Sequence, residues 1–545
     1  MESSRASGEG MMTGNDAPAR STSEGASVTR SAARVGAATM LSRVFGLARD
    51  TAFAVLFGTG FLADVFNLAF LIPNFFRRIV AEGNLNPAFV PVFTEVRELR
   101  GDAAAGRFLR RANGALAVIV IPLTLLGMLC AGPLVTLYAR NWRADAHGFA
   151  FAVFLLRVLF PTLPCAAFAA LSAAALNARG RFDVPALSPI LLSLGFLLGA
   201  AGAPLFHTAE TKLVAFSVGG LIGAFAAWLV QFPAARRSGI PNGIEWAPRD
   251  PDVLRVAHLM LPGFVALGVT QVNLFVDTLL ALRLEEGSLT ALRLGNRVTL
   301  LPLGVIAVAV ATTSLPALSR RAAVKDRAAL LDTLGHTLRL LLTLLVPATV
   351  GLCILARPIV SLLFQYGQFT AARSTPMTAN AAIFYALGLP AYGIARGIAQ
   401  AFYSVQDTKT PVKAGVASML ANIALNLSLM GPMRLSGLAL ATSLAGYVNV
   451  GFMLAPLGKK VGPLPMRPLL EALGRVALAS VALALGCWAG VFLGRMIPGT
   501  SLMARGAQVA IEVLLGLVAL LAAYRAMGHA EMKEILDSLP RRRIG

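Results

Sequence analysis

Long apolar segments follow one another along most of this chain, and short polar stretches separate them. Each segment is long enough to cross a hydrocarbon core of about 30 Å at about 1.5 Å per residue of helix. The segments lie at approximately 35–57, 62–80, 112–139, 147–176, 184–205, 212–233, 256–282, 289–316, 333–364, 376–404, 411–429, 435–457, 468–494 and 505–527. Backbone groups in lipid must be hydrogen-bonded internally, and no segment alternates like a barrel strand. The pattern therefore predicts an all-α polytopic membrane protein with about 14 transmembrane helices.

Prolines recur along the chain at a nearly constant spacing. Five pairs lie 225 or 226 residues apart, and they are Pro91 with Pro316, Pro122 with Pro347, Pro133 with Pro358, Pro164 with Pro390, and Pro185 with Pro411. Each repeat would contain six helices, and because six is even, both repeats would enter the membrane from the same side. We therefore expect two six-helix repeats in parallel orientation, with Pro164 and Pro390 bending helices within them.

This repeat divides the chain into five predicted parts. They are a disordered cytoplasmic tail at 1–33, an N-terminal six-helix repeat at 34–234, a C-terminal six-helix repeat at 253–457, two extra C-terminal helices at 468–527, and a basic cytoplasmic tail at 528–545. The first tail is rich in Ser, Gly, Ala and Thr, and it lacks the apolar core and cleavage site of a signal peptide. It is therefore predicted to be disordered.

The charge balance changes the expected partners and adds an orientation. The chain has 48 Lys and Arg against 27 Asp and Glu, a net charge of +21, although 56% of its residues are hydrophobic. Such a charge is typical of nucleic-acid binding, but the basic residues lie between apolar segments, so no nucleic acid is expected. Alternate loops hold nineteen basic residues against eight. By the positive-inside rule, both termini should be cytoplasmic.

Several charged and polar side chains fall inside the predicted helices, where each mid-bilayer arginine costs at least about 2.5 to 3.5 kcal/mol. Residues facing a water-filled cavity avoid this cost, and arginines there suit phosphate oxygens. The candidate substrate-binding residues are Ser42, Arg43, Arg49, Asp50, Asp64, Arg77 and Arg297. The alternatives are internal ion pairs and, for Arg77 and Arg78 at a helix end, side chains that extend to the membrane surface.

A second polar cluster is expected in the C-terminal repeat. Asp277 is a lone acid in an apolar segment, Asn422 and Asn426 are one turn apart, and Thr442 lies early in the next helix. Carboxylate, amide and hydroxyl oxygens are ligands for a small cation such as sodium. The alternative is hydrogen bonding between helices in lipid. No cofactor is expected, and a coupling cation, either sodium or a proton, is left open.

No enzyme signature stands out in the sequence. The four cysteines and five histidines lack metal-binding spacing, and neither a P-loop nor a GxSxG motif occurs. A transporter is therefore predicted rather than an enzyme.

Three ordered blocks carry a resemblance to a known family. They are SRVFGLARD at 42–50 followed by PNFFRRI at 73–79, FQYGQFT at 364–370, and FYSVQDTKTPVK at 402–413. With these blocks the chain resembles the MurJ/MviN family of lipid II flippases, in the superfamily that also holds multidrug exporters of the MATE type. One departure is Leu71, where relatives can carry a lysine.

The resemblance implies a central cationic cavity formed by Arg43, Arg49, Arg77 and Arg297 with Asp64. It implies outward transfer of lipid II, the undecaprenyl-pyrophosphate-linked disaccharide-pentapeptide, across the bacterial cytoplasmic (inner) membrane by alternating access. It also implies a lipid-tail groove at 468–527, a sodium site at the second polar cluster in some members, and the peptidoglycan synthesis machinery as a partner.

Three other functions remain alternatives on the sequence. They are transport of another polyprenyl-linked glycan, export of drugs in the manner of MATE proteins, and membrane-embedded glycosyl transfer. A cationic cavity disfavours cationic drugs, and no catalytic carboxylate pair is found for glycosyl transfer.

Overall fold

Helices form all of the regular secondary structure in the described residues of the computed structural model, which are 18–79, 85–239, 243–247 and 249–538. Nine stretches of this part of the chain are long and apolar enough to cross a membrane. The expectation of an all-α polytopic membrane protein is therefore confirmed.

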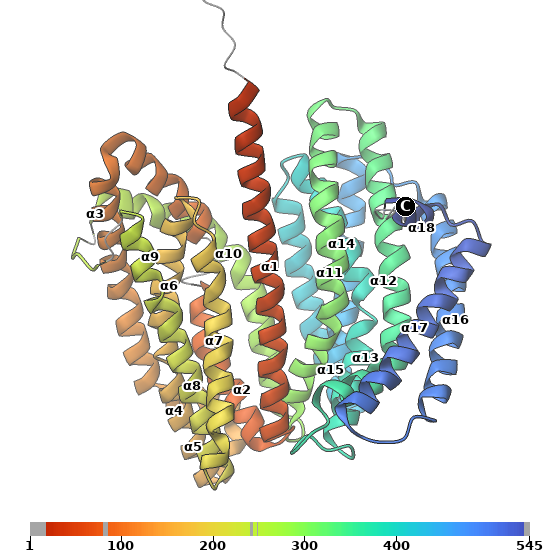
Figure 1. Cartoon of the computed structure of the whole chain (residues 1–545), viewed down its shortest axis with the longest axis horizontal. Coiled ribbons are helices and arrows are strands. Elements are labelled where there is room, and N and C mark those ends of the chain that lie inside the picture. The colour runs from red at the N-terminus through yellow and green to blue at the C-terminus, as the bar shows by residue number, and fades with distance from the viewer. Residues whose placement is uncertain (1–17, 80–84, 240–242, 248, 539–545) are drawn as a thin grey trace, which may run out of the picture.

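Two helical bundles stand side by side, with α1 (Pro18–Phe57) and α10 (Pro251–Ala281) between them (Figure 1). The first bundle contains α2 (Phe61–Arg77), α3 (Leu85–Leu129), α4 (Ala131–Tyr138), α5 (Ala146–Leu159), α6 (Thr162–Asn177), α7 (Asp183–Gly202), α8 (Ala209–Leu229) and α9 (Gln231–Arg237), with short 3-10 helices at Arg140–Ala144 and Ala203–Leu205.

The second bundle lies on the right of Figure 1. It contains α11 (Ser288–Ala323), α12 (Arg327–Phe364), α13 (Ser374–Ala386), α14 (Leu389–Ser404), α15 (Lys409–Lys460), α16 (Met466–Gly494), α17 (Leu502–Ala526) and α18 (Ala530–Ser538). The helices α16 and α17 form a hairpin at its outer edge, packed on α12.

Proline breaks the same helix in each predicted repeat. The expected helix at 147–176 divides into α5 and α6, and Pro164 lies in the first turn of α6. The expected helix at 376–404 divides into α13 and α14, where Pro390 lies in the first turn of α14. Proline lacks an N–H group and clashes with the carbonyl four residues before it, so each helix restarts at its proline. The predicted bends are confirmed.

Two long helices contain a residue with non-helical backbone. In α15, which has 52 residues, Arg434 has a φ of 49° and separates two segments that match the expected helices at 411–429 and 435–457. In α3, Gly101 has a φ of 82° and separates an additional helical segment from the expected span. The segment before Gly101 was not predicted from the hydropathy pattern.

Helices reach into both predicted terminal tails. Helix α1 begins at Pro18, inside the predicted tail at 1–33, whose disorder stays a prediction, and residues 1–17 lie outside the described part. Residues 18–33 extend the helix that continues to Phe57, and extending a helix needs no new nucleation. Within the predicted basic tail at 528–545, α18 packs on α12: Met532 is buried, and Arg339 Nε donates to Glu531 Oε1 at 2.6 Å.

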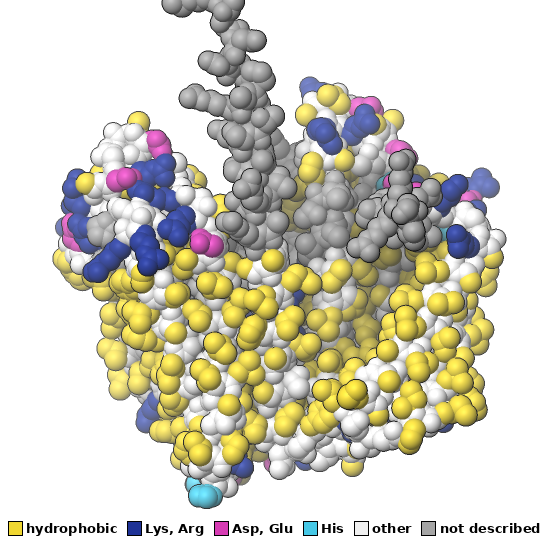
Figure 2. Space-filling view, in the orientation of Figure 1, with side chains coloured by type: hydrophobic (Ala, Val, Ile, Leu, Met, Phe, Trp, Pro, Cys, Tyr) yellow, Lys and Arg dark blue, Asp and Glu magenta, His cyan; other side chains and the backbone are white. Residues whose placement is uncertain are grey.

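The molecular surface has a broad hydrophobic band, and Lys and Arg side chains gather above it at the upper ends of both bundles (Figure 2). This is the distribution of a membrane protein whose basic loops lie on one side of the bilayer. Helix α1 runs from that upper end to the lower end of the molecule (Figure 1).

Glycines allow α7 and α8 to pack with their backbones in close contact. A Cβ atom on Gly219 of α8 would lie 2.4 Å from the carbonyl oxygen of Gly195 and 2.9 Å from Cα of Gly199, both on α7. Apolar burial does not drive helices together in lipid, so van der Waals contact between closely packed small residues contributes to holding α7 against α8.

The substitution Gly219→Ala should therefore destabilise the first bundle by about 1 to 3 kcal/mol, because its methyl group would overlap the α7 backbone. Gly474→Ala is the control, since nothing lies within 4 Å of a Cβ there and helical alanine is favoured by about 0.5 to 1 kcal/mol. The unfolding temperature of the purified protein in detergent measures both. Equal temperatures for the two variants would contradict this packing.

Candidate functional site

An ion-pair network joins α1 to α11 in the middle of the molecule. Asp50 Oδ1 accepts hydrogen bonds from Arg49 Nε at 3.0 Å and Nη2 at 2.7 Å, and Asp50 Oδ2 lies 3.1 Å from Arg297 Nε. The Arg49 guanidinium also lies over the ring of Phe196, 5.7 Å from its centroid. One carboxylate therefore holds two arginines, one from each side of the boundary between α1 and α11.

Glycines on both helices make room for the arginines. A Cβ on Gly46 of α1 would lie 2.7 Å from Arg297 Nη2, and a Cβ on Gly304 of α11 would lie 3.2 Å from Arg43 Nη1. Each helix thus presents a glycine to an arginine of the other, and the two helices run past each other in opposite directions.

The arginine side chains of this network are accessible to solvent. Arg43 is exposed, and the side chains of Arg297 and Arg49 are 39% and 23% exposed. Charges within membrane-spanning helices that keep this much exposure face water or a polar ligand rather than lipid. The structure therefore brings together the predicted Arg43, Arg49, Asp50 and Arg297, and Ser42 is half-buried beside them in the chain.

Arg293 belongs to the same group, although the sequence reasoning missed it. It lies one helical turn before Arg297 on α11, its side chain is exposed, and its Nη1 donates to the carbonyl oxygen of Asn67 at 3.1 Å. Charged residues four apart share a helix face, and this spacing was the available signal.

Arg77 is placed differently from the other predicted arginines. It is the last residue of α2 and is half-buried, and its Nε donates to Asn74 Oδ1 at 2.7 Å on the same helix. A role for Arg77 in binding substrate stays a prediction, as does the alternative that it extends to the membrane surface.

Asp64 has a structural function that the sequence did not reveal. Its side chain is 3% exposed, Oδ2 accepts a hydrogen bond from the Gly287 N–H at 2.7 Å, and Oδ1 accepts from the Thr290 N–H at 2.9 Å and Oγ1 at 2.7 Å. These N–H groups lie at the start of α11, where the first N–H groups of a helix have no carbonyl partner within the helix. Asp64 of α2 therefore caps α11, and its carboxylate is engaged there rather than in the exposed arginine group.

The lower ends of the two bundles are locked together through backbone contacts. The Gln368 N–H donates to the carbonyl oxygen of Val55 at 2.9 Å. Gly58 and Gly367 have φ values of 61° and 55°, and a Cβ on either would lie 2.5 Å or less from a carbonyl oxygen of the opposing segment. Only glycine combines this backbone conformation with so close an approach.

Side chains add to this lower contact. Thr59 Oγ1 donates to Ser374 Oγ at 2.8 Å, and Asn67 Nδ2 donates to Thr290 Oγ1 at 2.8 Å. Tyr138 and Phe275 form an edge-to-face ring pair with centroids 4.8 Å apart. We call the contacts of 55–67 with 287–290 and 367–374 the lower lock.

Comparisons with known proteins show the family of this chain. The family model described as lipid II flippase MurJ matches residues 53–504. A probable lipid II flippase MurJ of Vibrio cholerae is 36% identical over 77% of this chain and 81% of the relative, and one of Rhizobium meliloti is 35% identical over 85% and 87%. The chain belongs to the MurJ family of lipid II flippases. It is therefore a transporter rather than an enzyme.

Solved structures place the MurJ fold beside that of MATE exporters. A structure of lipid II flippase MurJ in an inward closed conformation has a TM-score of 0.74 at 26% identity, covering 90% of this chain and 99% of that one. An inward-facing MATE family transporter of the MOP superfamily has a TM-score of 0.63 at 13% identity, covering 79% and 98%. The second likeness concerns the fold alone.

The second polar cluster predicted for this MurJ family member is also assembled. Asn426 Nδ2 donates to Asp277 Oδ1 at 2.6 Å and to Asn422 Oδ1 at 2.9 Å, and Asn422 Nδ2 donates to Thr442 Oγ1 at 3.3 Å. The four side chains supply oxygen ligands of the right kind for sodium, but both amides turn N–H groups inward here. Cation binding would need these amides to rotate, so it stays a proposal beside the hydrogen-bonded alternative.

Because Asp64 caps α11, replacing it by asparagine should lower the stability of the protein. Asp64→Asn would remove the charge and turn an amide N–H toward backbone N–H donors, so the free energy of unfolding should fall by about 1 to 3 kcal/mol. The control is Asp183→Asn, whose side chain is 55% exposed and should change stability by less than about 0.5 kcal/mol. Unfolding of the purified protein in detergent measures both, and an unchanged Asp64→Asn protein would refute the cap.

Proposed function

We propose that this chain moves lipid II from the inner to the outer leaflet of the bacterial cytoplasmic membrane by alternating access.

The chemistry of the network suits a pyrophosphate group. Among the described residues, Asp50 is the acid that pairs with Arg49 and Arg297, while Arg43 and Arg293 add two further positive charges to the group, so it keeps an excess of positive charge. Guanidinium groups bind phosphate oxygens in pairs, and a pyrophosphate has enough oxygens for several of them. A bound pyrophosphate would compete with Asp50 for Arg297 and so change the contact between α1 and α11.

That competition supplies the differential binding that a conformational change requires. A ligand shifts an equilibrium only if it binds one conformation better than the other. Substrate bound between α1 and α11 would replace the Asp50–Arg297 pair, and the repeats at 34–234 and 253–457 would rock about this point. An inside-negative potential favours outward movement of an anion by about 2.3 kcal/mol per charge per 100 mV.

The membrane arrangement that we propose has about fourteen spans. Nine stretches meet the length and hydropathy required, and α15 within them is long enough to cross twice because it breaks at Arg434. Adding α1, α2, α10 and α11, which join the same bundles, gives fourteen. With the basic ends inside, both termini are cytoplasmic and the lower lock faces the periplasm.

The extra helices α16 and α17 are suited to the polyprenyl tail. Both present exposed apolar side chains, among them Leu485 and Trp488 on α16 and Leu514 and Val518 on α17. We propose that the tail stays in this hydrocarbon environment while the head group crosses, and that the released lipid II passes to the peptidoglycan synthesis machinery. Sodium or a proton acting at the cluster around Asp277 would reset the empty carrier.

Replacing Arg297 by Gln should abolish translocation of lipid II, because it removes the charge that Asp50 and the pyrophosphate share. The measurement is translocation in proteoliposomes under an imposed potential, with sodium replaced by choline in a second series. Arg495→Gln is the control, because this exposed arginine lies outside the network. Full activity of a folded Arg297→Gln protein would overturn the site, and equal rates in both salts would remove sodium from the cycle.

A further inference from the structure

A basic cavity lies at the upper end of the second bundle, built from residues outside the network between α1 and α11. Its volume is about 200 Å³. Three separate segments form it: the turn between α11 and α12, the residue that follows α14, and the end of α15. The lining residues are Arg321, Ala322, Lys325, Asp326, Arg327, Leu330, Val405, Lys460 and Val461.

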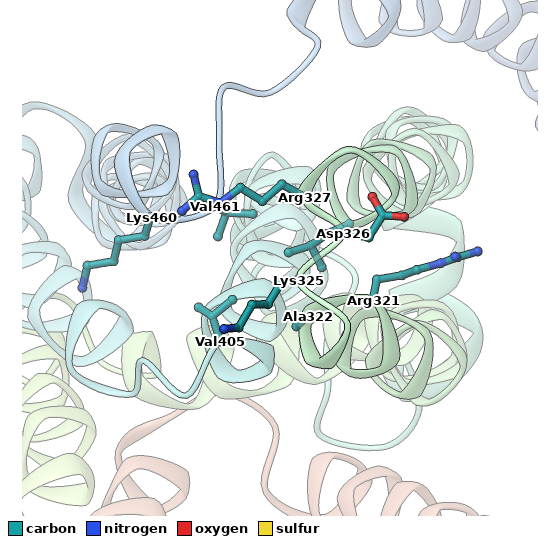
Figure 3. Close-up of a pocket in the computed structure, with 9 residues that line it drawn as sticks. Arg321, Ala322, Lys325, Asp326, Arg327, Val405, Lys460 and Val461 are labelled. Atoms are coloured by element: carbon teal, nitrogen blue, oxygen red, sulfur yellow. The ribbon is translucent and has the colours of Figure 1, made fainter.

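Two of the four cations in this lining point into the cavity. In Figure 3 the Lys325 side chain extends toward Val405 and the Arg327 side chain toward Val461, while Arg321 points away. Among the residues that the structure describes, no ion pair involves Lys325 or Arg327. The floor between them is apolar, with Val461 fully buried.

Both acids near the cavity have other partners. Asp326 Oδ1 accepts a hydrogen bond from the Ala329 N–H at 3.0 Å and so caps α12. Asp407 Oδ2 binds Lys460 Nζ at 2.5 Å. Desolvation raises the pKa of Asp407, but the hydrogen bonds from Lys460 and Thr410 lower it by more. The pKa is therefore well below its usual value, and Asp407 stays ionised. The described lining therefore holds four cations against one carboxylate, that of Asp326, and keeps an excess of positive charge.

The backbone at Lys325 is of a kind that usually requires glycine. Lys325 has a φ of 57°, and it ends α11 through hydrogen bonds from its N–H to Ala322 at 3.0 Å and from the Asp326 N–H to Arg321 at 3.2 Å. Glycine is strongly preferred at this position of a helix end. A lysine held there in a strained conformation indicates that its side chain serves a purpose, and that side chain reaches into the cavity.

We propose that the cavity binds the phosphate group of an anionic ligand between Lys325 and Arg327. The guanidinium can contact two phosphate oxygens at once, the ammonium adds a point charge, and the N-terminal end of α12 adds its positive dipole. The apolar floor would accept the carbon atoms next to the phosphate. The head group of an anionic phospholipid and a soluble phosphate share this chemistry.

The test compares the double variant Lys325→Gly/Arg327→Gln with the wild type. Glycine suits the backbone at 325, so the variant should unfold at the same temperature as the wild type or higher. Lys459→Gln is the matched control, because it removes an exposed charge beside the cavity but not from its lining. The central arginines are present in all three proteins, so differences among them report the cavity and not lipid II transport.

Two probes distinguish the sources of the phosphate. Calorimetry measures the affinity for inorganic pyrophosphate, and native mass spectrometry counts phosphatidylglycerol retained from nanodiscs against phosphatidylcholine. We expect the double variant to lose at least tenfold in affinity, or to retain less phosphatidylglycerol, while Lys459→Gln stays within twofold of the wild type. A loss with pyrophosphate alone indicates a soluble ligand, and a loss with phosphatidylglycerol alone indicates a lipid. A double variant that matches Lys459→Gln with both probes would overturn the proposal.

Discussion

Charged side chains on membrane-spanning helices must find a partner or water, and this constraint shapes the centre of the molecule. Arg43, Arg49 and Arg297 could not face lipid without a cost of at least about 2.5 to 3.5 kcal/mol each. They instead meet between α1 and α11, where Asp50 binds two of them and glycines leave room for their guanidinium groups.

The two ends of the molecule are built from different interactions. At the lower end the bundles meet through a backbone hydrogen bond, left-handed glycines and the buried cap from Asp64 to α11, so the contact tolerates little sliding. At the upper end the basic loops gather on each bundle. Opening the lower lock requires the loss of several buried hydrogen bonds together, and bound substrate is the natural source of the compensating free energy.

The part of the structure that the sequence could predict is the part that depends on hydropathy, proline and charge. The all-α membrane fold and the breaks at Pro164 and Pro390 follow from rules that act on single residues or short spacings, and the same rules marked Arg49, Asp50 and Arg297 as charges that need a partner or water. The polar cluster around Asp277 assembled for the same reason, because isolated polar groups in lipid seek one another.

What the sequence could not predict depends on neighbours that are far apart in the chain. The sequence shows that Asp64 is a charged residue within a predicted span, which suggested a place in the cavity. It does not show that the N–H groups at the start of α11 bind this carboxylate. The lower lock rests on glycines whose positive φ values appear only in three dimensions. Helix α18 lies within the predicted basic tail, and its contacts with α12, such as the pair of Arg339 and Glu531, join residues that are far apart in the chain.

Under the proposed alternating access, lipid II can cross only if the lower lock opens, and a cross-link tests this requirement most directly. Thr59 Oγ1 and Ser374 Oγ lie 2.8 Å apart, so Thr59→Cys and Ser374→Cys together should form a disulfide across the lock. With single-cysteine variants as controls, translocation of lipid II in proteoliposomes should stop on oxidation and return on reduction. Unchanged translocation by fully cross-linked protein would contradict the requirement that the lower lock opens.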